Sequence, residues 1–335
     1  MNFPPERIQD IAHLGSVELL TPNLDGSVWY FCDVLGMTEV ARRDRSVYLR
    51  AYGDYAETTL KLTEAKHPGP GCISWRASSP QALQRRVKAL EEAGYGIGWS
   101  NGDHGRGPSY RFNDPEGHLM EVYFEEDKYR APPEERSTLK NLPQKFSGRG
   151  VAVRRIDHLA LLARDVTKNR EFVQTLLGFQ LREQVLFNEG QTEIGSWLST
   201  SQIHHQVAYV ADVKSGTGRL HHFALWLDEY QDVLRAADIL AENKIFIEAG
   251  PSKHNNSQAF YLYSFEPGGN RIEVYSGGYL VTAPDWEPVT WNEEERGTGV
   301  YWGAALPESF LNYATPDVPT DADAPKLNVP IFDPR

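Results

Sequence analysis

The chain of 335 residues contains only two cysteines, and it has no apolar run long enough to span a bilayer. Two cysteines are too few for a disulfide framework, and we expect Cys32, within an amphipathic helical pattern, to be a buried free thiol. Because a spanning helix needs about 20 apolar residues, we expect no membrane segment. Residues 1–7 lack the apolar stretch of a signal peptide, which predicts a cytoplasmic protein.

Positive charge is also scarce. Lys and Arg number 34 against 46 Asp and Glu, which gives a net charge of −12. A polyanion would be repelled by such a chain, so we expect neither nucleic acid nor an anionic membrane surface as a partner. The apolar fraction of 40% and the charged fraction of 24% are those of an ordinary globular protein. The length suits two domains.

The two halves of the chain repeat each other. Leu-Gly-Met at 35–37 recurs as Leu-Gly-Phe at 177–179, and Asp-Pro-Glu-Gly at 114–117 recurs as Glu-Pro-Gly-Gly at 266–269. Such repetition indicates duplicated supersecondary units. Helical and strand periodicities follow the order strand, helix, three strands, twice in each half. The sequence therefore predicts an α+β protein of two domains, each with two βαβββ modules whose curled sheet encloses a cavity.

The domain boundaries follow from composition. We expect a structural N-terminal domain at 1–135 and a polar, Gly-containing linker at 136–150. The metal-binding C-terminal domain is expected at 151–303. The remaining residues, 304–335, are rich in Pro and Asp, and we expect this tail to pack over a neighbouring surface or to be partly disordered.

Three residues with metal-binding side chains lie in strand-like runs of the second half: His158, His222 and Glu273. A single strand histidine is usually hydrogen-bonded in a core, and a single strand glutamate usually faces solvent. Two histidines and one carboxylate from different strands can instead bind a metal on one face and leave its other face open. That arrangement is typical of non-haem Fe(II) enzymes that handle O2.

The repeat indicates which half binds the metal. Applying the offset between the halves gives the first-half counterparts of the three candidate ligands, which are Ser16, Cys72 or a neighbour, and Glu121. Only the glutamate keeps a metal-binding side chain of the same type. We therefore expect the chemistry in the second half and a structural role for the first.

The run from His254 to Glu273 resembles the signature of the type I extradiol ring-cleavage dioxygenases. This family is the catechol 2,3-dioxygenase branch of the vicinal-oxygen-chelate superfamily. The run carries a His, a Tyr and a Glu at the expected offsets, and it departs at Ser252, where the family usually has Gly, Asn, Thr, Ile or Val. The resemblance covers about residues 8–303. It implies that His158, His222 and Glu273 bind Fe(II), with Mn(II) as the alternative metal.

The resemblance also implies an acid–base histidine outside the metal ligands. His205 matches that residue by its register against Ala208, although Gln206 stands where the family has Asp. His204 is the alternative if the register slips by one residue. Near neutral pH an imidazole suits proton delivery.

Two further residues match the signature itself, His254 and Tyr263. They would donate hydrogen bonds to the bound substrate. His221 adjoins His222 and would point to the other side of the strand, so we expect a structural role for it, with a hydrogen bond to the backbone.

The implied reaction is extradiol cleavage of catechol, or a substituted catechol, by O2 to a yellow 2-hydroxymuconic semialdehyde. Relatives that cleave carboxylate-bearing catechols have Arg at places that here hold Ala249 and Gly299, while Lys253 and Arg296 are displaced in register. We therefore expect a neutral catechol. Residues 288–302 resemble the family's lid, and the family implies a homo-oligomer, often a tetramer.

Two other classes stay open on the sequence alone. One is a different metalloenzyme of the superfamily, such as a glyoxalase-like isomerase, which typically has a fourth protein ligand. The other is a metal-free protein that binds aromatic compounds. O2 consumption and metal dependence separate these classes from the dioxygenase.

Overall fold

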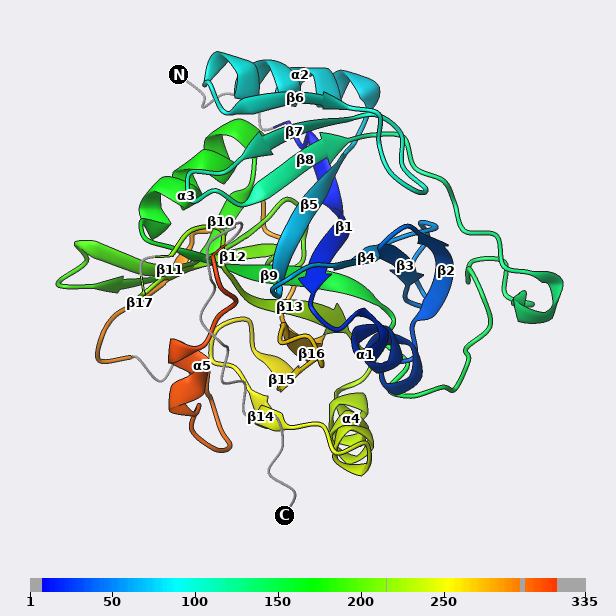
Figure 1. Ribbon diagram of the computed structural model, residues 1–335. Coiled ribbons are helices and arrows are strands. Elements are labelled where there is room, and N and C mark those ends of the chain that lie inside the picture. The colour runs from blue at the N-terminus through cyan, green and yellow to red at the C-terminus, as the bar shows by residue number, and fades with distance from the viewer. Residues whose placement is uncertain (1–7, 215, 296–298, 318–335) are drawn as a thin grey trace.

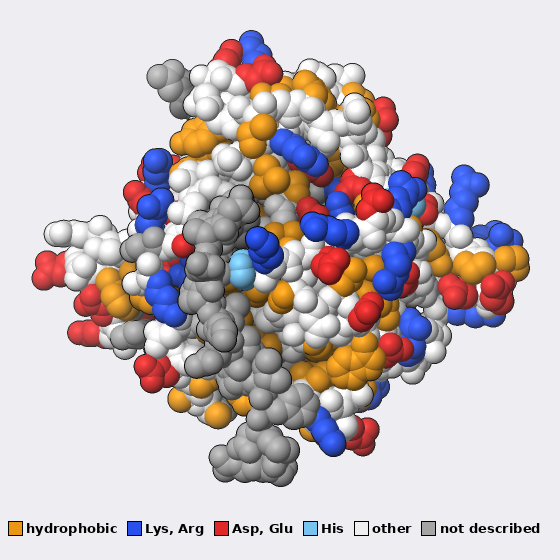
Figure 2. Space-filling view, in the orientation of Figure 1, with side chains coloured by type: hydrophobic (Ala, Val, Ile, Leu, Met, Phe, Trp, Pro, Cys, Tyr) orange, Lys and Arg blue, Asp and Glu red, His pale blue; other side chains and the backbone are white. Residues whose placement is uncertain are grey.

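The computed structural model describes residues 8–214, 216–295 and 299–317 (Figure 1). The expectations for residues 1–7, for Arg296 and for the tail beyond Asp317 lie outside these described residues. Among the residues described, no helix is both long and apolar enough to cross a membrane. Figure 2 shows acidic and basic side chains next to one another on one face of the molecule, so the negative charge is not gathered into one patch there.

The first half forms an eight-stranded mixed sheet with the order β2-β3-β4-β1-β5-β8-β7-β6. Its elements are β1 (Ile11–Thr21), α1 (Leu24–Trp29), η1 (Tyr30–Val34), β2 (Thr38–Arg43), β3 (Ser46–Arg50), β4 (Leu60–Glu64), β5 (Gly69–Ala77), α2 (Pro80–Glu92), β6 (Gly96–Ser100), β7 (Ser109–Asn113) and β8 (Leu119–Tyr123). A short helix, η2 (Pro133–Glu135), follows in the connection to the second half. The order strand, helix, three strands occurs twice, as predicted.

The second half forms a nine-stranded mixed sheet with the order β14-β15-β16-β13-β9-β12-β11-β10-β17. Its elements are β9 (Arg155–Ala163), α3 (Val166–Phe172), η3 (Val173–Leu177), β10 (Gln180–Phe187), β11 (Thr192–Ser199), β12 (Val207–Ala211), β13 (Leu220–Trp226), α4 (Tyr230–Glu242), β14 (Ile247–Lys253), β15 (Ala259–Phe265), β16 (Arg271–Gly277), β17 (Val289–Trp291) and α5 (Glu308–Asn312). The two βαβββ modules of this half are confirmed, and β17 and α5 are additions to them.

The repeated Leu-Gly pairs end equivalent helices. Helices α1 and α3 each continue into one π-helical turn, and the glycines that follow, Gly36 and Gly178, have φ angles of 82° and 80°. Such left-handed backbone commonly ends a helix, and glycine adopts it without steric cost. At the other end, the side chains of Asn23 and Asp165 accept hydrogen bonds from the first turns.

Buried apolar side chains of the two halves form one continuous core. Trp75 of β5 packs edge-on against Phe179 with ring centroids 4.9 Å apart, and Phe112 of β7 lies 6.0 Å from Phe172 of α3. Cys32 belongs to the same core and is a free thiol, as predicted. The first half therefore supports the second through shared packing.

The repeated turns reach across between the halves. The Glu266 carboxylate accepts the backbone N–H of Gly268 within its own turn at 2.7 Å and the hydroxyl of Ser27 from the first half at 2.5 Å. Its counterpart, Asp114, accepts the hydroxyl of Tyr209 from the second half at 3.0 Å. Each turn starts a strand and also holds the other half in place.

Candidate metal centre

Three neighbouring strands in the middle of the second sheet carry the predicted ligands. His158 lies on β9, His222 on β13 and Glu273 on β16, and all three residues are buried. Ala224 of β13 pairs with both His158 and Glu273. Because side chains alternate along a strand, Ala224 and His222, two residues apart, face the same side. The register thus brings three residues distant in sequence to one point.

Ligand atoms of these three residues lie within 4.8 Å of one another. His158 Nε2 is 3.0 Å from Glu273 Oε2 and 3.3 Å from His222 Nε2, and His222 Nε2 is 3.3 Å from Glu273 Oε2. Among the residues that the structure describes, this is the one group of His, Cys, Asp and Glu with such geometry.

The hydrogen bond at the far nitrogen of His158 fixes its tautomer. His158 Nδ1 lies 2.7 Å from Asp157 Oδ2, so Nδ1–H donates to that carboxylate. Nε2 is therefore the nitrogen directed into the cluster. A carboxylate behind a histidine in this way orients the ring and raises its basicity as a metal ligand.

His222 is oriented through its neighbour. His221 Nε2 donates to the backbone carbonyl of Phe310 at 2.9 Å, which leaves His221 Nδ1 as an acceptor. The Nδ1 atoms of His221 and His222 are 2.7 Å apart, so His222 donates from Nδ1 and directs the lone pair of Nε2 into the cluster. Burial lowers the pKa of both imidazoles, that of His221 to about 3, which keeps them neutral.

The facing predicted for His221 was wrong, although its backbone hydrogen bond is present. Regular alternation would place His221 and His222 on opposite sides of β13. The pairing of β13 with β9 shifts register between Leu220 and His222, which breaks the alternation there. The two rings consequently lie 4.9 Å apart and make direct contact.

The charges in the cluster require a cation. Both carboxylate oxygens of Glu273 are buried and accept no hydrogen bond of normal geometry from the described residues. Burial opposes ionisation of Glu273, but the adjacent His158 and His254 hold its pKa well below its usual range. Burial also opposes charge on His158, yet Asp157 and Glu273 raise its pKa to about 9. A proton at His158 Nε2 or a divalent metal would satisfy this site, so the residues present fit a metal ion.

The equivalent carboxylate in the first half, that of Glu121, has both hydrogen-bond donors and a charged partner. Glu121 accepts the hydroxyls of Ser74 and Ser109 at 2.8 and 2.7 Å, and its Oε1 lies 2.9 Å from Nη1 of Arg106. Glu121 thus has the permanently charged Arg106 guanidinium beside it, whereas the groups beside Glu273 are histidines, which can bind either a proton or a metal. This arrangement supports the structural role expected for the N-terminal domain.

Of the two histidines proposed for acid–base chemistry, His205 is the one beside the cluster. Its ring centroid is 3.9 Å from that of His158, and His204 lies behind it, with the two Nδ1 atoms 2.8 Å apart. Gln206 accepts the backbone N–H and the hydroxyl of Thr200 at 2.9 and 2.8 Å. It braces the loop before β12, so its amide is engaged with the loop and not with the His205 ring.

His254 and Tyr263 lie on the other side of the cluster and contact each other. His254 Nε2 is 3.1 Å from the Tyr263 hydroxyl and 3.4 Å from Glu273 Oε1. His254 Nδ1–H donates to the carbonyl of Gly299 at 2.6 Å. The segment that resembles a lid therefore orients one of the predicted catalytic residues.

Apolar and aromatic groups surround this side of the site. Tyr261 and Tyr263 form a small buried cluster with Ala249, against which Phe310 of α5 packs. Two cations of the described residues lie nearby and are engaged with other groups: Lys253 Nζ lies over the ring of Phe260 at 5.3 Å, and the Arg271 guanidinium is bound to Glu248 at 2.6 Å.

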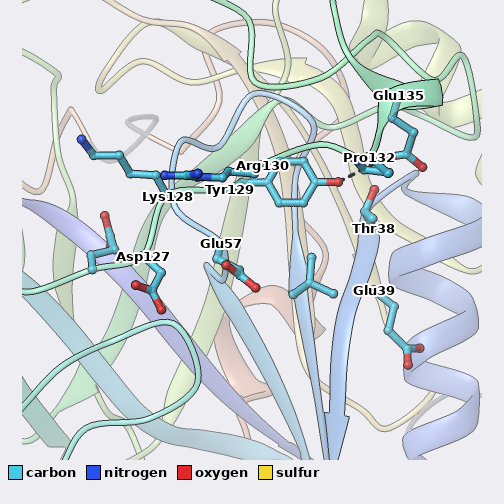
Figure 3. Close-up of a pocket in the computed structure, with 11 residues that line it drawn as sticks. Thr38, Glu39, Glu57, Asp127, Lys128, Tyr129, Arg130, Pro132 and Glu135 are labelled. Carbon is cyan, nitrogen blue, oxygen red and sulfur yellow. Dashed lines mark hydrogen bonds between the residues drawn. The ribbon is translucent and has the colours of Figure 1, made fainter.

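A separate pocket of about 760 Å³ lies in the first half, beside β2 and the start of the connection to the second half. Figure 3 shows that its lining includes Glu57, Asp127 and Glu135 together with Lys128 and Arg130. It includes none of the predicted site residues, and its charged groups of both signs set it apart from the metal cluster.

Known proteins resemble the chain over most of its length. A family model described as the Glyoxalase/Bleomycin resistance protein/Dioxygenase superfamily matches residues 11–122 and 155–274. A metapyrocatechase of Geobacillus stearothermophilus is 46% identical over 93% of this chain and 95% of its own length. A manganese-dependent 2,3-dihydroxybiphenyl 1,2-dioxygenase of Geobacillus genomosp. 3 is 39% identical over 88% and 94%.

Solved structures agree with these sequence matches. The 2,3-dioxygenase LapB from Pseudomonas sp. KL28 superposes with a TM-score of 0.78 at 27% identity, covering 85% of this chain and 98% of that one. Homoprotocatechuate 2,3-dioxygenase from Brevibacterium fuscum, in complex with 3,4-dihydroxyphenylacetate, gives a TM-score of 0.79 at 26% identity, covering 90% and 91%. The chain therefore belongs to the Glyoxalase/Bleomycin resistance protein/Dioxygenase superfamily and, within it, to the extradiol dioxygenases.

Proposed function

We propose that this enzyme is a catechol 2,3-dioxygenase that binds Fe(II) through His158 Nε2, His222 Nε2 and the Glu273 carboxylate. The observation that carries the proposal is the convergence of two oriented imidazole nitrogens on a buried carboxylate that has no hydrogen-bond partner of normal geometry among the described residues. Such a donor set suits Fe(II) and leaves coordination positions free. When bound, Fe(II) supplies a Lewis acid for the two catechol oxygens and a site for O2.

The chain's own residues supply proton transfer and orientation. Burial and the adjacent His158 lower the pKa of His205 well below its ordinary value, so its imidazole is neutral before substrate binds. A neutral imidazole in a dry site can take the proton of a catechol hydroxyl and return it later. On the other side, Tyr263 and His254 provide an O–H and a ring nitrogen to orient the substrate.

The surroundings favour a neutral catechol. Ala249, Tyr261 and Phe310 offer apolar contacts, while Arg271 is already paired with Glu248 and Lys253 lies over Phe260. Neither Arg271 nor Lys253 is therefore free to pair with a carboxylate on the substrate, so burying such a group beside these two residues would carry a desolvation cost. Two curated relatives are named metapyrocatechase, which supports catechol itself as the substrate class.

Metal identity is part of the proposal. The donor set accepts Mn(II) as well as Fe(II), and one relative is named manganese-dependent. The test is O2 uptake by metal-free protein reconstituted anaerobically with either metal, using catechol, 3- and 4-methylcatechol and homoprotocatechuate. Uptake with Fe(II) and the neutral catechols supports the proposal. O2 uptake with Mn(II) alone would show that the metal is manganese and not iron. A preference for homoprotocatechuate would overturn the substrate assignment.

The same measurement separates the other classes. An isomerase would consume no O2 with any metal, and a binding protein would retain its aromatic ligand after metal removal. We further propose a cytoplasmic homo-oligomer, a tetramer by family resemblance. The buried free thiols Cys32 and Cys72 suit a reducing compartment, and light scattering on the purified enzyme tests the tetramer.

A further inference from the structure

A buried glutamate stands behind the two histidines at 204–205. Glu183 of β10 is 1% exposed, and its Oε1 lies 2.8 Å from His204 Nε2. His204 was considered above only as an alternative to His205, and Glu183 has no role in the site as described so far.

Four donors converge on the Glu183 carboxylate. Besides His204 Nε2, they are the Tyr279 hydroxyl at 2.7 Å, the Ser257 backbone N–H at 3.0 Å and the Trp291 indole N–H at 2.6 Å. Burial alone would raise the pKa of Glu183, but the hydrogen bonds from His204 and Tyr279 lower it below its ordinary value. The carboxylate is consequently ionised and acts only as an acceptor.

An ionised Glu183 determines the protons of both histidines. His204 must donate from Nε2, and burial lowers its pKa more than Glu183 raises it, so the ring is neutral and Nδ1 is an acceptor. The Nδ1 atoms of His204 and His205 are 2.8 Å apart, so His205 must carry the proton of this contact. Its Nε2, to which no described residue makes a hydrogen bond, is then unprotonated.

Comparison with the second histidine pair shows what the carboxylate adds. The pair at 221–222 has the same Nδ1–Nδ1 contact, but a neutral carbonyl, that of Phe310, anchors it. A carbonyl is therefore sufficient to fix a tautomer. A carboxylate also stabilises positive charge on the chain of rings, which matters only for a histidine that gains a proton.

We infer that Glu183 and His204 are positioning residues for His205: they hold its proton at Nδ1, keep Nε2 open to the substrate and stabilise the imidazolium formed there. The inference rests on the proposed function. In the step it describes, the catechol O–H bond breaks, its electron pair stays on oxygen, and the proton bonds to His205 Nε2. The proton later returns to an oxygen of the product, so the chain of residues ends unchanged.

The direct test is the tautomer of His205 in the full-length wild-type protein. We would label histidine with ¹⁵N, load the protein with diamagnetic Zn(II), and record long-range ¹H–¹⁵N correlation spectra, assigning His205 with H205Q. We expect a proton on Nδ1 of His205 and on Nε2 of His204. A proton on Nε2 of His205, or two protons on His204, would overturn the inference.

Kinetics of the Fe(II)-loaded variants provide the second readout. We expect E183Q and H204F to lower kcat by about 10- to 100-fold, which is part of the roughly 100- to 10,000-fold that a positioned acid–base group contributes, with KM almost unchanged. In H204F, His205 Nδ1 loses its acceptor, so we expect the His205 proton to be shared between the two ring nitrogens. An unchanged kcat in both variants would contradict the positioning role. A rise in KM of about 10- to 100-fold with kcat unchanged would indicate a role in substrate binding and would also overturn the positioning role.

The matched control is E193Q. Glu193 is a buried carboxylate on the neighbouring strand β11, bound to Thr167 and Arg170 at 2.7 and 2.9 Å. Its variant loses a buried charge in the same sheet and is expected to keep both the tautomer and kcat. If the wild-type tautomer is as inferred but the Fe(II)-loaded enzyme cleaves no catechol, the proposed function fails and the assignment of the proton stands.

Discussion

Glu121 and Glu273 occupy equivalent positions of the internal repeat but have opposite surroundings. Glu121 accepts hydrogen bonds from Ser74, Ser109 and Arg106, whereas no described residue gives the oxygens of Glu273 a hydrogen bond of normal geometry. A carboxylate with all its partners contributes to stability, and one without them costs free energy unless a cation binds. The same residue type therefore serves the fold in one half and the site in the other.

This contrast predicts opposite effects of the same substitution. E121Q leaves Arg106 with only the more distant Asp103, 3.8 Å away, as a charged partner. We expect a loss of roughly 3 kcal/mol in the free energy of unfolding, with the metal-induced rise in Tm retained. E273Q is expected to abolish that rise, which in the wild type corresponds to about 2.7 kcal/mol at a metal concentration 100 times Kd. Thermal unfolding with and without anaerobic Fe(II) checks both. A metal-dependent rise in E273Q would contradict the ligand assignment.

His221 tests the orientation of a ligand without touching the metal. H221F removes the acceptor for His222 Nδ1, and we expect metal affinity to fall by about 10- to 100-fold. Metal content after dialysis against a graded chelator measures the change. H13F is a suitable control because His13 is exposed on β1. Equal affinities in the two variants would show that His221 does not orient His222.

At the residue scale, the sequence was informative about the cluster and silent about its supports. His158, His222 and Glu273 could be grouped because the repeat and the signature placed them on separate strands of one domain. The hydrogen-bond partner of His221 could not be identified from the sequence, because Phe310 is 89 residues away and contributes a backbone carbonyl. The bulge that turns His221 toward His222 has no signature in the residue pattern.

At the scale of elements, α5 and β17 complete the site. Helix α5 supplies the carbonyl of Phe310 to His221, and its residue Ser309 accepts a hydrogen bond from Arg271 at 3.1 Å. Strand β17 pairs with β10 and supplies Trp291 to Glu183. The described part of the tail therefore packs on the second domain, which is one of the two outcomes expected from its composition.

A truncation tests the contribution of α5. A chain that ends after Gly303 loses the contact to His221 and the apolar cover of Tyr263, and we expect metal affinity to fall by roughly 10-fold or more. The matched control ends after Asp317 and retains every contact of α5 described above. Isothermal titration with Zn(II) compares the two chains, and equal affinities would contradict the role given to α5.

The four βαβββ modules were predictable because each obeys helical or strand periodicity and recurs. Spacing of Val233, Ala236 and Leu240 predicts a helix, and α4 buries all three. Strand β17 has three residues and α5 has five, too few for a period to be visible. Their positions depend on contacts with Glu183 and Arg271 that only the folded chain brings together.

At the scale of the whole molecule, the two halves share one core and a buried ion pair at their contact. His118 Nδ1 lies 2.8 Å from Asp114 in the first half, and its Nε2 donates to the carbonyl of Arg219 in the second at 3.0 Å. Burial alone would lower the pKa of His118, but Asp114 raises it above the ordinary 6.5. Glu116 adds to the same effect.

This pair predicts a pH dependence of stability. Because the folded-state pKa of His118 is raised, its contribution is complete below about pH 6.5 and is lost as the pH rises through the folded pKa. We expect the wild type to lose stability relative to H118Q as the pH rises above about 6.5 in urea unfolding. Parallel curves for the two proteins would show that His118 is not protonated in the folded state.

The most direct test of the central claim is the identity of the product that Fe(II)-loaded wild-type enzyme forms from catechol in air. Optical absorbance and mass spectrometry together define it. The account predicts a yellow product, heavier than catechol by one molecule of O2, that carries one aldehyde and one carboxylate. Colourless muconate, which has the same mass and two carboxylates, or unreacted catechol despite bound Fe(II), would contradict extradiol cleavage at the cluster of His158, His222 and Glu273.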